Sequence, residues 1–250
     1  MTRELDGFTL LELLVSVAIV GVLAALLIPA ASQAYAQSSL AVSAGNLRQL
    51  AAGTSSYLAD NQHTFWKYRA NGANGGTTWW FGNETTASAS LPEGRRTFDA
   101  SQSPLEGYLP AGFRPDPSFT VTGKAFKPKY QFGYLGIGYN ILLGGGWLGT
   151  GKLKRYWDLP DPGKTVVFAT SAQVNTFQAP ASAKNPMIEE FYGIDQNEVT
   201  VHFRHHGQAM VAYASGSVGF LPIDEATRDS RAPKANIGRF APKGSKKYLE

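Results

Sequence analysis

The chain of 250 residues contains no cysteine. Disulfide bonds, thiolate metal sites and cysteine nucleophiles are therefore excluded, whereas an oxidising compartment is not, since proteins function there without disulfides. Charge is also sparse, because Asp, Glu, Lys and Arg make up 17% of the residues and leave a net charge of +4. The composition excludes a strongly basic protein, and we expect no specific nucleic-acid partner.

What basic charge there is lies at the C-terminal end. Residues 228–250 hold seven basic and two acidic side chains, so this segment carries +5 and the rest of the chain carries −1. We expect a solvated, partly disordered tail there, because a segment with so much like charge has little apolar surface to bury. The basic pI then describes a tail and not a binding face.

A long apolar run near the N-terminus is the most informative segment. The stretch DGFTLLELLVSVAIVGVLAALLIPAA, residues 6–31, begins with Asp6 and holds one further acid, Glu12, inside an otherwise apolar run. Its length matches the roughly 20 residues that cross a bilayer as a helix, which predicts a transmembrane segment over residues 8–31. A secretory signal peptide cut near Ser32 is the rival interpretation, although Arg3 is accompanied by two acids and the run is long.

The motif GFTLLE, residues 7–12, resembles the processing motif of type IV pilins and type II secretion pseudopilins. The resemblance implies that a prepilin peptidase removes the leader, residues 1–7, by cutting between Gly7 and Phe8. It further implies that the new N-terminus, Phe8, is methylated, and that Glu12 takes part in filament assembly. The expected partners are prepilin peptidase/methyltransferase, other pilin subunits, an inner-membrane assembly platform and the lipid bilayer.

Elementary chemistry agrees with this role for Glu12. An acid within a membrane span usually has a partner or a function, and cleavage would create an ammonium group on Phe8, four residues away. The amine of a neighbouring subunit is the alternative favoured by the resemblance, in which case the ion pair sets the register of packed helices. An ordinary signal anchor with a tolerated acid stays open. Gly21 and Pro29 weaken the helix, and the resemblance to pilins implies that they let it bend or melt; alternatively, Pro29 marks the membrane exit.

The remaining sequence predicts an α+β fold. We expect one helix over residues 8–60, its second half packed on an antiparallel β-sheet head with long loops, as in pilins. The head is assigned to residues 61–227, in the periplasm, with the tail over residues 228–250. Tyr68–Ser90 is interpreted as a long irregular loop, with Trp79 and Trp80 as core anchors or, alternatively, as a ligand surface.

The C-terminal half predicts an antiparallel meander. Thr165–Ala169 is expected to be a buried strand, and residues 199–203, 210–214 and 218–221 three further strands joined by turns. In the strand expected at residues 199–203, the alternation of apolar and polar residues predicts a buried face of Val and Phe and a polar face carrying His202 and Arg204. Three of the four histidines cluster here, but they lack a carboxylate at ligand spacing, so we expect neither a metal site nor a catalytic site.

The same stretch resembles the signature of the H-X9-DG subgroup of prepilin-like proteins. His205 stands at the histidine position, and Ser215 and Gly216 stand where the subgroup has Asp-Gly. Serine retains the turn hydrogen bond of aspartate but removes a carboxylate that could bind calcium.

The expected function is structural: a filament subunit of a type II secretion pseudopilus or a type IV pilus-like fibre, without cofactor or enzymatic activity. A minor subunit is favoured, because a head this large is bulky for a close-packed repeat. Two rivals remain: a membrane-tethered periplasmic binding protein with a pocket formed by Trp79, Trp80 and the histidines, and a membrane-anchored hydrolase. The machine, the ligand of the head and the secretion, motility or uptake role are not determined by the sequence.

Overall fold

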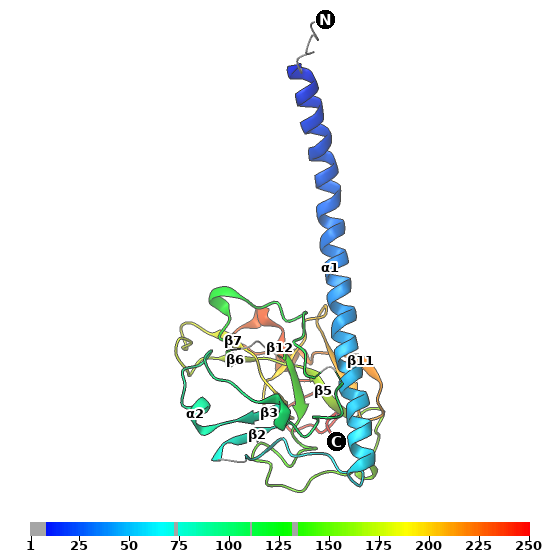
Figure 1. Cartoon of the computed structure of the whole chain (residues 1–250), viewed down its shortest axis with the longest axis vertical. Helices are drawn as coiled ribbons and strands as arrows, with labels where there is room; N and C mark the ends of the chain where they lie inside the picture. The colour runs from blue at the N-terminus through cyan, green and yellow to red at the C-terminus, as the bar shows by residue number, and fades with distance from the viewer. Residues whose placement is uncertain (1–8, 73–74, 111, 132–134) are drawn as a thin grey trace, which may run out of the picture. The chain divides into compact units, whose positions relative to one another are not determined.

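The computed structural model describes residues 9–72, 75–110, 112–131 and 135–250. The chain divides into two compact units, one that ends at Ala41 and one that begins at Val42. A single long helix, α1 (Leu10–Asp60), contributes residues to both units (Figure 1). This helix confirms the long N-terminal helix predicted from the sequence.

The first unit consists of the N-terminal part of α1. All of its side chains from Leu10 to Ser38 are exposed, so hydrogen bonds within the helix, and not burial of side chains, hold this segment in place. Apolar side chains point outward on every face, which is typical of a helix that crosses a membrane and not of a helix that packs on a protein core.

In the second unit, the C-terminal part of α1 is amphipathic. Leu47, Leu50, Ala51 and Leu58 are buried, and their spacing of three, four and seven residues places them on one face of a helix. Gly53 allows close packing on that face, because a Cβ atom there would lie 2.8 Å from Cδ2 of Leu109 and 2.9 Å from the carbonyl oxygen of Tyr108.

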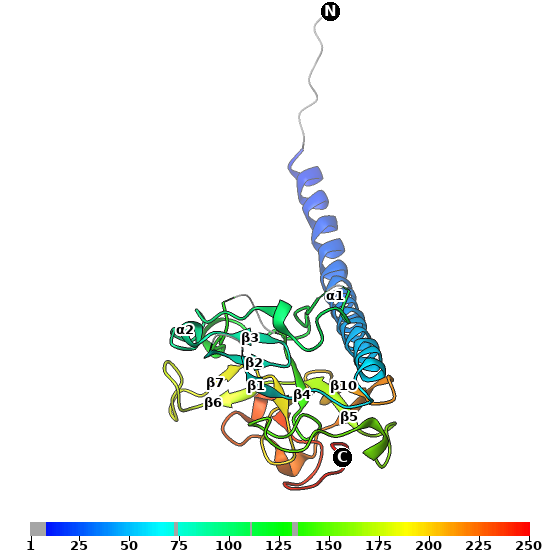
Figure 2. The ribbon, with the colours of Figure 1, turned by 60° about the horizontal axis from the view of Figure 1, so that its bottom comes forward.

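The main sheet of the second unit has five strands in the order β11-β10-β5-β4-β8, of which β10, β5 and β4 are labelled in Figure 2. Its pairs are antiparallel except β4 with β8, which is parallel. The strands are β4 (Ile137–Asn140), β5 (Val166–Thr170), β8 (Gly193–Ile194), β10 (Gln208–Tyr213) and β11 (Val218–Pro222). All five residues of the central strand β5 are buried, as the sequence predicted for this segment.

Three small sheets complete the head. One is three-stranded, with β1 (Arg69–Asn71), β2 (Thr77–Trp79) and β3 (Gly82–Glu84), and two are two-stranded, with β6 (Gln173–Asn175) and β7 (Met187–Glu189), and β9 (Val201–His202) and β12 (Ile237–Gly238). The short helices are α2 (Thr86–Ala89), η2 (Ala100–Gln102), η3 (Gly123–Ala125), η4 (Tyr156–Asp158), η5 (Glu225–Thr227) and η6 (Pro233–Ala235). The arrangement is α+β, as predicted.

An aromatic cluster fills the core between α1 and the sheet. Trp66 stacks on Tyr139 with ring centroids 4.8 Å apart, and Trp80 lies 5.1 Å from Phe168 of β5. Tyr57 of α1 meets Trp66 edge to face at 5.1 Å. Such pairs contribute about 0.5–1.5 kcal/mol each beyond the burial of their area, so this cluster is a principal attachment between the helix and the sheet.

The structure contradicts two predictions of irregular segments, one for a loop and one for the C-terminal tail. The segment Tyr68–Ser90, expected to be irregular, contains the three-stranded sheet β1-β2-β3 and α2. The basic segment 228–250, expected to be solvated, packs into the head: Ile237, Phe240 and Leu249 are buried. Alternating apolar residues between the charges supply this burial, and net charge alone concealed them.

The predicted meander is confirmed for two of its three strands. β10 and β11 pair antiparallel in register, with Met210 opposite Phe220. The first predicted strand, residues 199–203, shortens to β9 and pairs instead with β12 from the C-terminal segment. Its polar face is not solvated, because Thr200 and His202 are buried.

Candidate functional site

The N-terminal end of α1 forms a capping box. The main-chain N–H and the hydroxyl of Thr9 both donate to Oε2 of Glu12, at 2.9 and 2.8 Å, and the Glu12 N–H donates to the Thr9 hydroxyl at 3.2 Å. This reciprocal pattern satisfies free N–H groups at a helix start. The predicted cleavage residues Gly7 and Phe8 lie outside the described residues.

Thr9 was missed as a partner of Glu12, although its signal is present in the sequence. A threonine followed three residues later by glutamate, directly before an apolar run, predicts a helix N-terminus. The Glu12 carboxylate is therefore hydrogen-bonded at the start of its own helix.

Past Glu12, α1 carries no charged residue until Arg48. An 18-residue window of the helix reaches a mean hydropathy of 2.7, and none of that window is buried inside the protein. By length and composition the helix is able to cross a membrane. Glu12 consequently stands at one end of an uncharged segment, where an acid is costly unless it is paired.

Gly21 and Pro29 both lie inside α1, which continues through them. A Cβ atom at Gly21 would meet nothing within 4 Å, so no close packing within the chain requires glycine there. Pro29 has no N–H to donate to the carbonyl of Ala25, and the hydroxyl of Ser32 donates to the Pro29 carbonyl at 2.9 Å.

His205 and the Ser215-Gly216 pair lie at opposite ends of β10. His205 begins the turn into β10, closed by two main-chain hydrogen bonds of 3.0 Å with Gln208, and Ser215 and Gly216 form the turn from β10 to β11. There the Gly216 N–H donates to the Tyr213 carbonyl at 2.9 Å, and Gly216 has φ +89°, the left-handed conformation that favours glycine. The two halves of the signature therefore do not form one site.

Around His205 lies a buried ion pair between Arg204 and Asp116. Arg204 Nη2 donates to Asp116 Oδ2 at 2.5 Å, with side-chain exposures of 5% and 1%. The same nitrogen donates to the carbonyl of Gly136 at 2.6 Å, and Nε donates to the Ser118 hydroxyl at 3.0 Å. Burial would raise the pKa of Asp116, but Arg204 and hydrogen bonds from serines outweigh it and hold that pKa below its ordinary value.

This ion pair is connected to α1. The hydroxyl of Ser43 donates to Oδ1 of Asp116, and the Asn46 side-chain amide donates to the carbonyl of Pro115 at 3.2 Å. We call Ser43, Asp116, Ser118 and Arg204 the helix clamp, because together they fasten the helix to the loop that carries Asp116. The helix residue of the clamp, Ser43, lies at the start of the second unit, directly after Val42.

The two histidines beside the clamp are held neutral. Arg204 Nη1 donates to Nδ1 of His202 at 3.0 Å, and Nε2 of His205 lies 3.3 Å from the Ser118 hydroxyl. Burial, reinforced by the Arg204 charge, lowers the pKa of His202 well below its ordinary value and that of His205 to about 4. Among the described residues, no group of three His, Asp or Glu side chains is placed to hold a metal ion.

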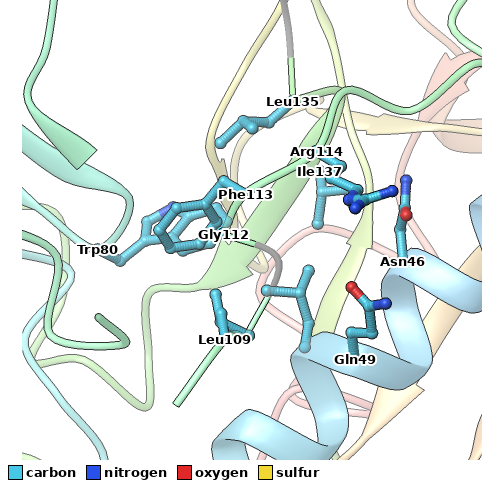
Figure 3. Close-up of a pocket in the computed structure, with 10 residues that line it drawn as sticks. Asn46, Gln49, Trp80, Leu109, Gly112, Phe113, Arg114, Leu135 and Ile137 are labelled. Atoms are coloured by element: carbon cyan, nitrogen blue, oxygen red, sulfur yellow. The ribbon is translucent and has the colours of Figure 1, made fainter. Parts of the chain in front are cut away.

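A crevice lies between α1 and the loop before the clamp (Figure 3). Phe113 covers Trp80, at a ring distance of 5.5 Å and an angle of 78°, while Asn46 and Gln49 of α1 form the polar rim. The described lining holds neither an acid nor a histidine nor a hydroxyl group, and its polar side chains include Asn46, Gln49 and Arg114. Its lining is Asn46, Gln49, Leu50, Trp80, Leu109, Gly112, Phe113, Arg114, Leu135 and Ile137.

The ligand pocket expected from Trp79, Trp80 and the histidines does not form. Trp80 is fully buried, and its indole N–H donates to the Tyr192 carbonyl at 2.6 Å. Trp79 is half-buried and stacks on Phe81 at 6.3 Å. Trp80 is a core anchor, which was the favoured interpretation.

Comparison with known proteins decides what the N-terminal segment is. Residues 6–28 match the protein family described as the prokaryotic N-terminal methylation motif. The chain carries a prepilin-type methylation motif. Its match covers Glu12 and Gly21 and stops one residue before Pro29.

A curated relative supports the same conclusion. The type II secretion system core protein G of Pseudomonas aeruginosa is 39% identical over 59 residues, which is 24% of this chain and 42% of that protein. The chain thus spans less than half of the relative's length. No solved structure matches the chain. Motif and similarity together support a pilin- or pseudopilin-type subunit.

Proposed function

We propose that the protein is a structural subunit of a type II secretion pseudopilus or a type IV pilus-like filament. One observation carries the proposal: the methylation motif at residues 6–28 lies on a helix whose side chains are exposed up to Ser38 and, past Glu12, uncharged up to Arg48. Such a helix requires lipid or other helices around it. The bilayer supplies this environment before assembly and neighbouring subunits supply it afterwards, while the head lies outside the cytoplasm.

Processing is the first step of this function. A prepilin peptidase cuts between Gly7 and Phe8, and the new amino group of Phe8 is methylated. Mass spectrometry of the protein from its native membrane tests this step, with methyl-Phe8 as the expected N-terminus. An N-terminus at Met1 would favour the membrane-tethered binding protein instead, and one near Ser32 would indicate a secreted soluble protein.

Assembly is the second step and depends on Glu12. Thr9 satisfies part of the carboxylate within one subunit, and the amino group of Phe8 in a neighbouring subunit supplies the opposite charge. The pair sets the register of helices, because an uncompensated acid inside the bundle costs about 2.5–3.5 kcal/mol.

Replacing the acid separates insertion from assembly. We expect Glu12→Gln to insert and to be processed but not to enter filaments. Ser16→Ala is the matched control, since Ser16 lies one turn further along the same helix and its hydroxyl donates only to the Glu12 main-chain carbonyl. Normal incorporation of Glu12→Gln into filaments would refute the register role.

Gly21 and Pro29 belong to the same step. Both lower the cost of opening helical hydrogen bonds, and we assign them to local bending or melting of α1 as the subunit passes from bilayer to filament. The partners of this passage are other pilin subunits, the prepilin peptidase/methyltransferase and the inner-membrane assembly platform.

The size of the head favours a minor subunit. The second unit extends from Val42 to Glu250, which is bulky for a unit that repeats at close spacing along a fibre. Electron microscopy of fibres from cells that lack this chain tests the assignment. A minor subunit predicts fibres that are fewer or shorter, whereas complete loss of fibres would identify a major subunit.

A further inference from the structure

One tryptophan of the head is exposed. The Trp157 side chain is 66% exposed, whereas those of Trp66 and Trp80 are 2% and 0% exposed. Exposing so large an apolar side chain is unfavourable in the absence of a partner. It is therefore a feature that the described contacts of the fold do not explain.

The backbone around Trp157 is fixed and holds the indole in place. Residues 63–65 and 154–156 are joined by two main-chain hydrogen bonds, from the Tyr156 N–H to the His63 carbonyl at 2.7 Å and from the Phe65 N–H to the Lys154 carbonyl at 3.0 Å. Leu159, two residues on, is buried and anchors the turn. An aromatic ring held out by a pinned backbone loses little entropy when it binds a ligand.

Two neighbouring rings contact Trp157 edge to face. The His63 and Tyr156 rings each lie 5.0 Å from the indole, at 62° and 89° to it. Neither ring is parallel to the indole, so the three do not form a row of stacking platforms. The indole provides a single flat apolar surface with the His63 imidazole and the Tyr156 phenol beside it.

Basic side chains lie close to Trp157 along the chain. Lys152 and Arg155 are exposed, and Lys154 lies 3.6 Å from Glu250, which Lys246 also contacts at 2.7 Å. Glu250 thus joins Lys154 to a basic residue of the packed C-terminal segment. Four cations, Lys152, Lys154, Arg155 and Lys246, stand against two acids, Asp158 and Glu250. We use the name indole patch for the four cations together with the three aromatic rings of His63, Tyr156 and Trp157.

We propose that the indole patch binds an acidic polysaccharide. A sugar ring has an apolar face that packs on an indole, and the carboxylates of an acidic sugar pair with Arg155 and the lysines. The imidazole of His63 and the phenol of Tyr156 beside the indole suit hydroxyl groups. Single-stranded nucleic acid is also anionic, but its recognition uses successive aromatic platforms on which neighbouring bases stack. The rings of this patch meet edge to face, so they provide a single platform and not a row.

The inference goes beyond the filament role and does not depend on processing, so it is tested with the purified full chain in detergent. The probes are alginate, neutral dextran and oligothymidylate, and binding is measured by affinity electrophoresis over a range of salt concentrations. We expect alginate to retard the wild-type chain, with an effect that falls as salt rises because surface charges are screened. Dextran is expected to have no effect.

Variants assign the binding to the patch. We expect Trp157→Ala to weaken alginate binding about fivefold and Arg155→Gln to weaken it and to reduce its salt dependence. Phe177→Ala is the matched control, because Phe177 is a similarly exposed aromatic residue, at 68%, on another loop, and its removal is expected to change nothing.

Three results would overturn the proposal: no retardation by alginate, equal retardation of the wild-type chain and Trp157→Ala, or tighter binding of oligothymidylate than of alginate. The last would reassign the patch to nucleic acid. Circular dichroism confirms that each variant is folded, so loss of binding reports on the surface alone.

Discussion

The two units of this chain deal with apolar surface in opposite ways. Up to Ser38, the helix exposes every side chain and holds one charged group, Glu12, at its beginning. From Val42 onward the chain buries most of its large apolar side chains and also buries charged ones, such as Arg204 and Asp116 at 5% and 1% exposure. The first unit relies on its surroundings for stability, and the second unit supplies its own.

The difference shows where specificity lies in each unit. In the first, apolar positions are interchangeable as far as lipid is concerned, and the specific information resides in Thr9 and Glu12. In the second, individual positions matter, because close packing and paired charges tolerate little change. Substitutions should therefore have large effects on stability in the head and small ones in the first unit.

The sharpest test of this comparison breaks the helix clamp. We expect Asp116→Ala to lower the free energy of unfolding of the head by about 3–5 kcal/mol, because it leaves Arg204 buried without its partner. Urea unfolding followed by tryptophan fluorescence measures this loss. Adding Arg204→Met should recover part of it. Ile19→Ala in the first unit is the control and should leave the transition unchanged.

A second test uses pH, because His202 and His205, which lie beside the helix clamp, are buried in their neutral form. His205 has a pKa of about 4 in the folded chain and an ordinary value of about 6.5. Between these values the unfolded chain binds more protons, so stability is complete above pH 6.5 and is lost as the pH falls towards 4. The expected loss is about 2–3 kcal/mol.

The titration of Glu190 changes stability with pH in the opposite direction to that of His205. The effect of His205 is therefore measured in a variant that lacks the Glu190 carboxyl group. Burial raises the pKa of Glu190 to about 7, so its contribution to stability is present below pH 4.5 and is lost as the pH rises to about 7. In Glu190→Gln the stability should therefore rise with pH between about 4.5 and 6.5 more steeply than in the wild type. Adding His205→Gln should flatten that rise, and an unchanged slope would refute the assignment to His205.

Features formed by residues that are close along the chain could be predicted from the sequence in both units. The long apolar helix and the capping box depend on residues that are close to one another along the chain, and the spacing of Thr9 and Glu12 was readable although it was overlooked. The β10–β11 hairpin was predicted for the same reason: its two strands are adjacent along the chain, and Ser215 with Gly216 marks the turn.

The rest depends on contacts between distant segments. Asp116 meets Ser43 across 73 residues and Arg204 across 88, and nothing local in either stretch indicates the partner. Strand β12 lies in a segment whose charges suggested a solvated tail. Its pairing with β9 rests on two residues, too few to produce a pattern.

Two glycines of α1 provide a smaller and more finely matched test. At Gly53 a Cβ atom would lie 2.8 Å from Leu109 and 2.9 Å from the Tyr108 carbonyl, so Gly53→Ala should destabilise the head by about 1–3 kcal/mol. At Gly45 nothing lies within 4 Å, and Gly45→Ala should stabilise the helix by about 0.5–1 kcal/mol. Urea unfolding with effects of the same sign for both variants would contradict the packing described for Gly53.

The smallest expected effect concerns the first unit itself. Pro29 leaves the Ala25 carbonyl without its helical donor, so Pro29→Ala restores one hydrogen bond and should slow amide hydrogen exchange over the neighbouring turns of α1. Exchange measured by mass spectrometry in lipid nanodiscs detects this change. The head should exchange at an unaltered rate, because no described contact of the head involves this segment. If exchange near Pro29 were unaffected while filament entry failed, the proline would act by shaping contacts between subunits and not by loosening its own helix.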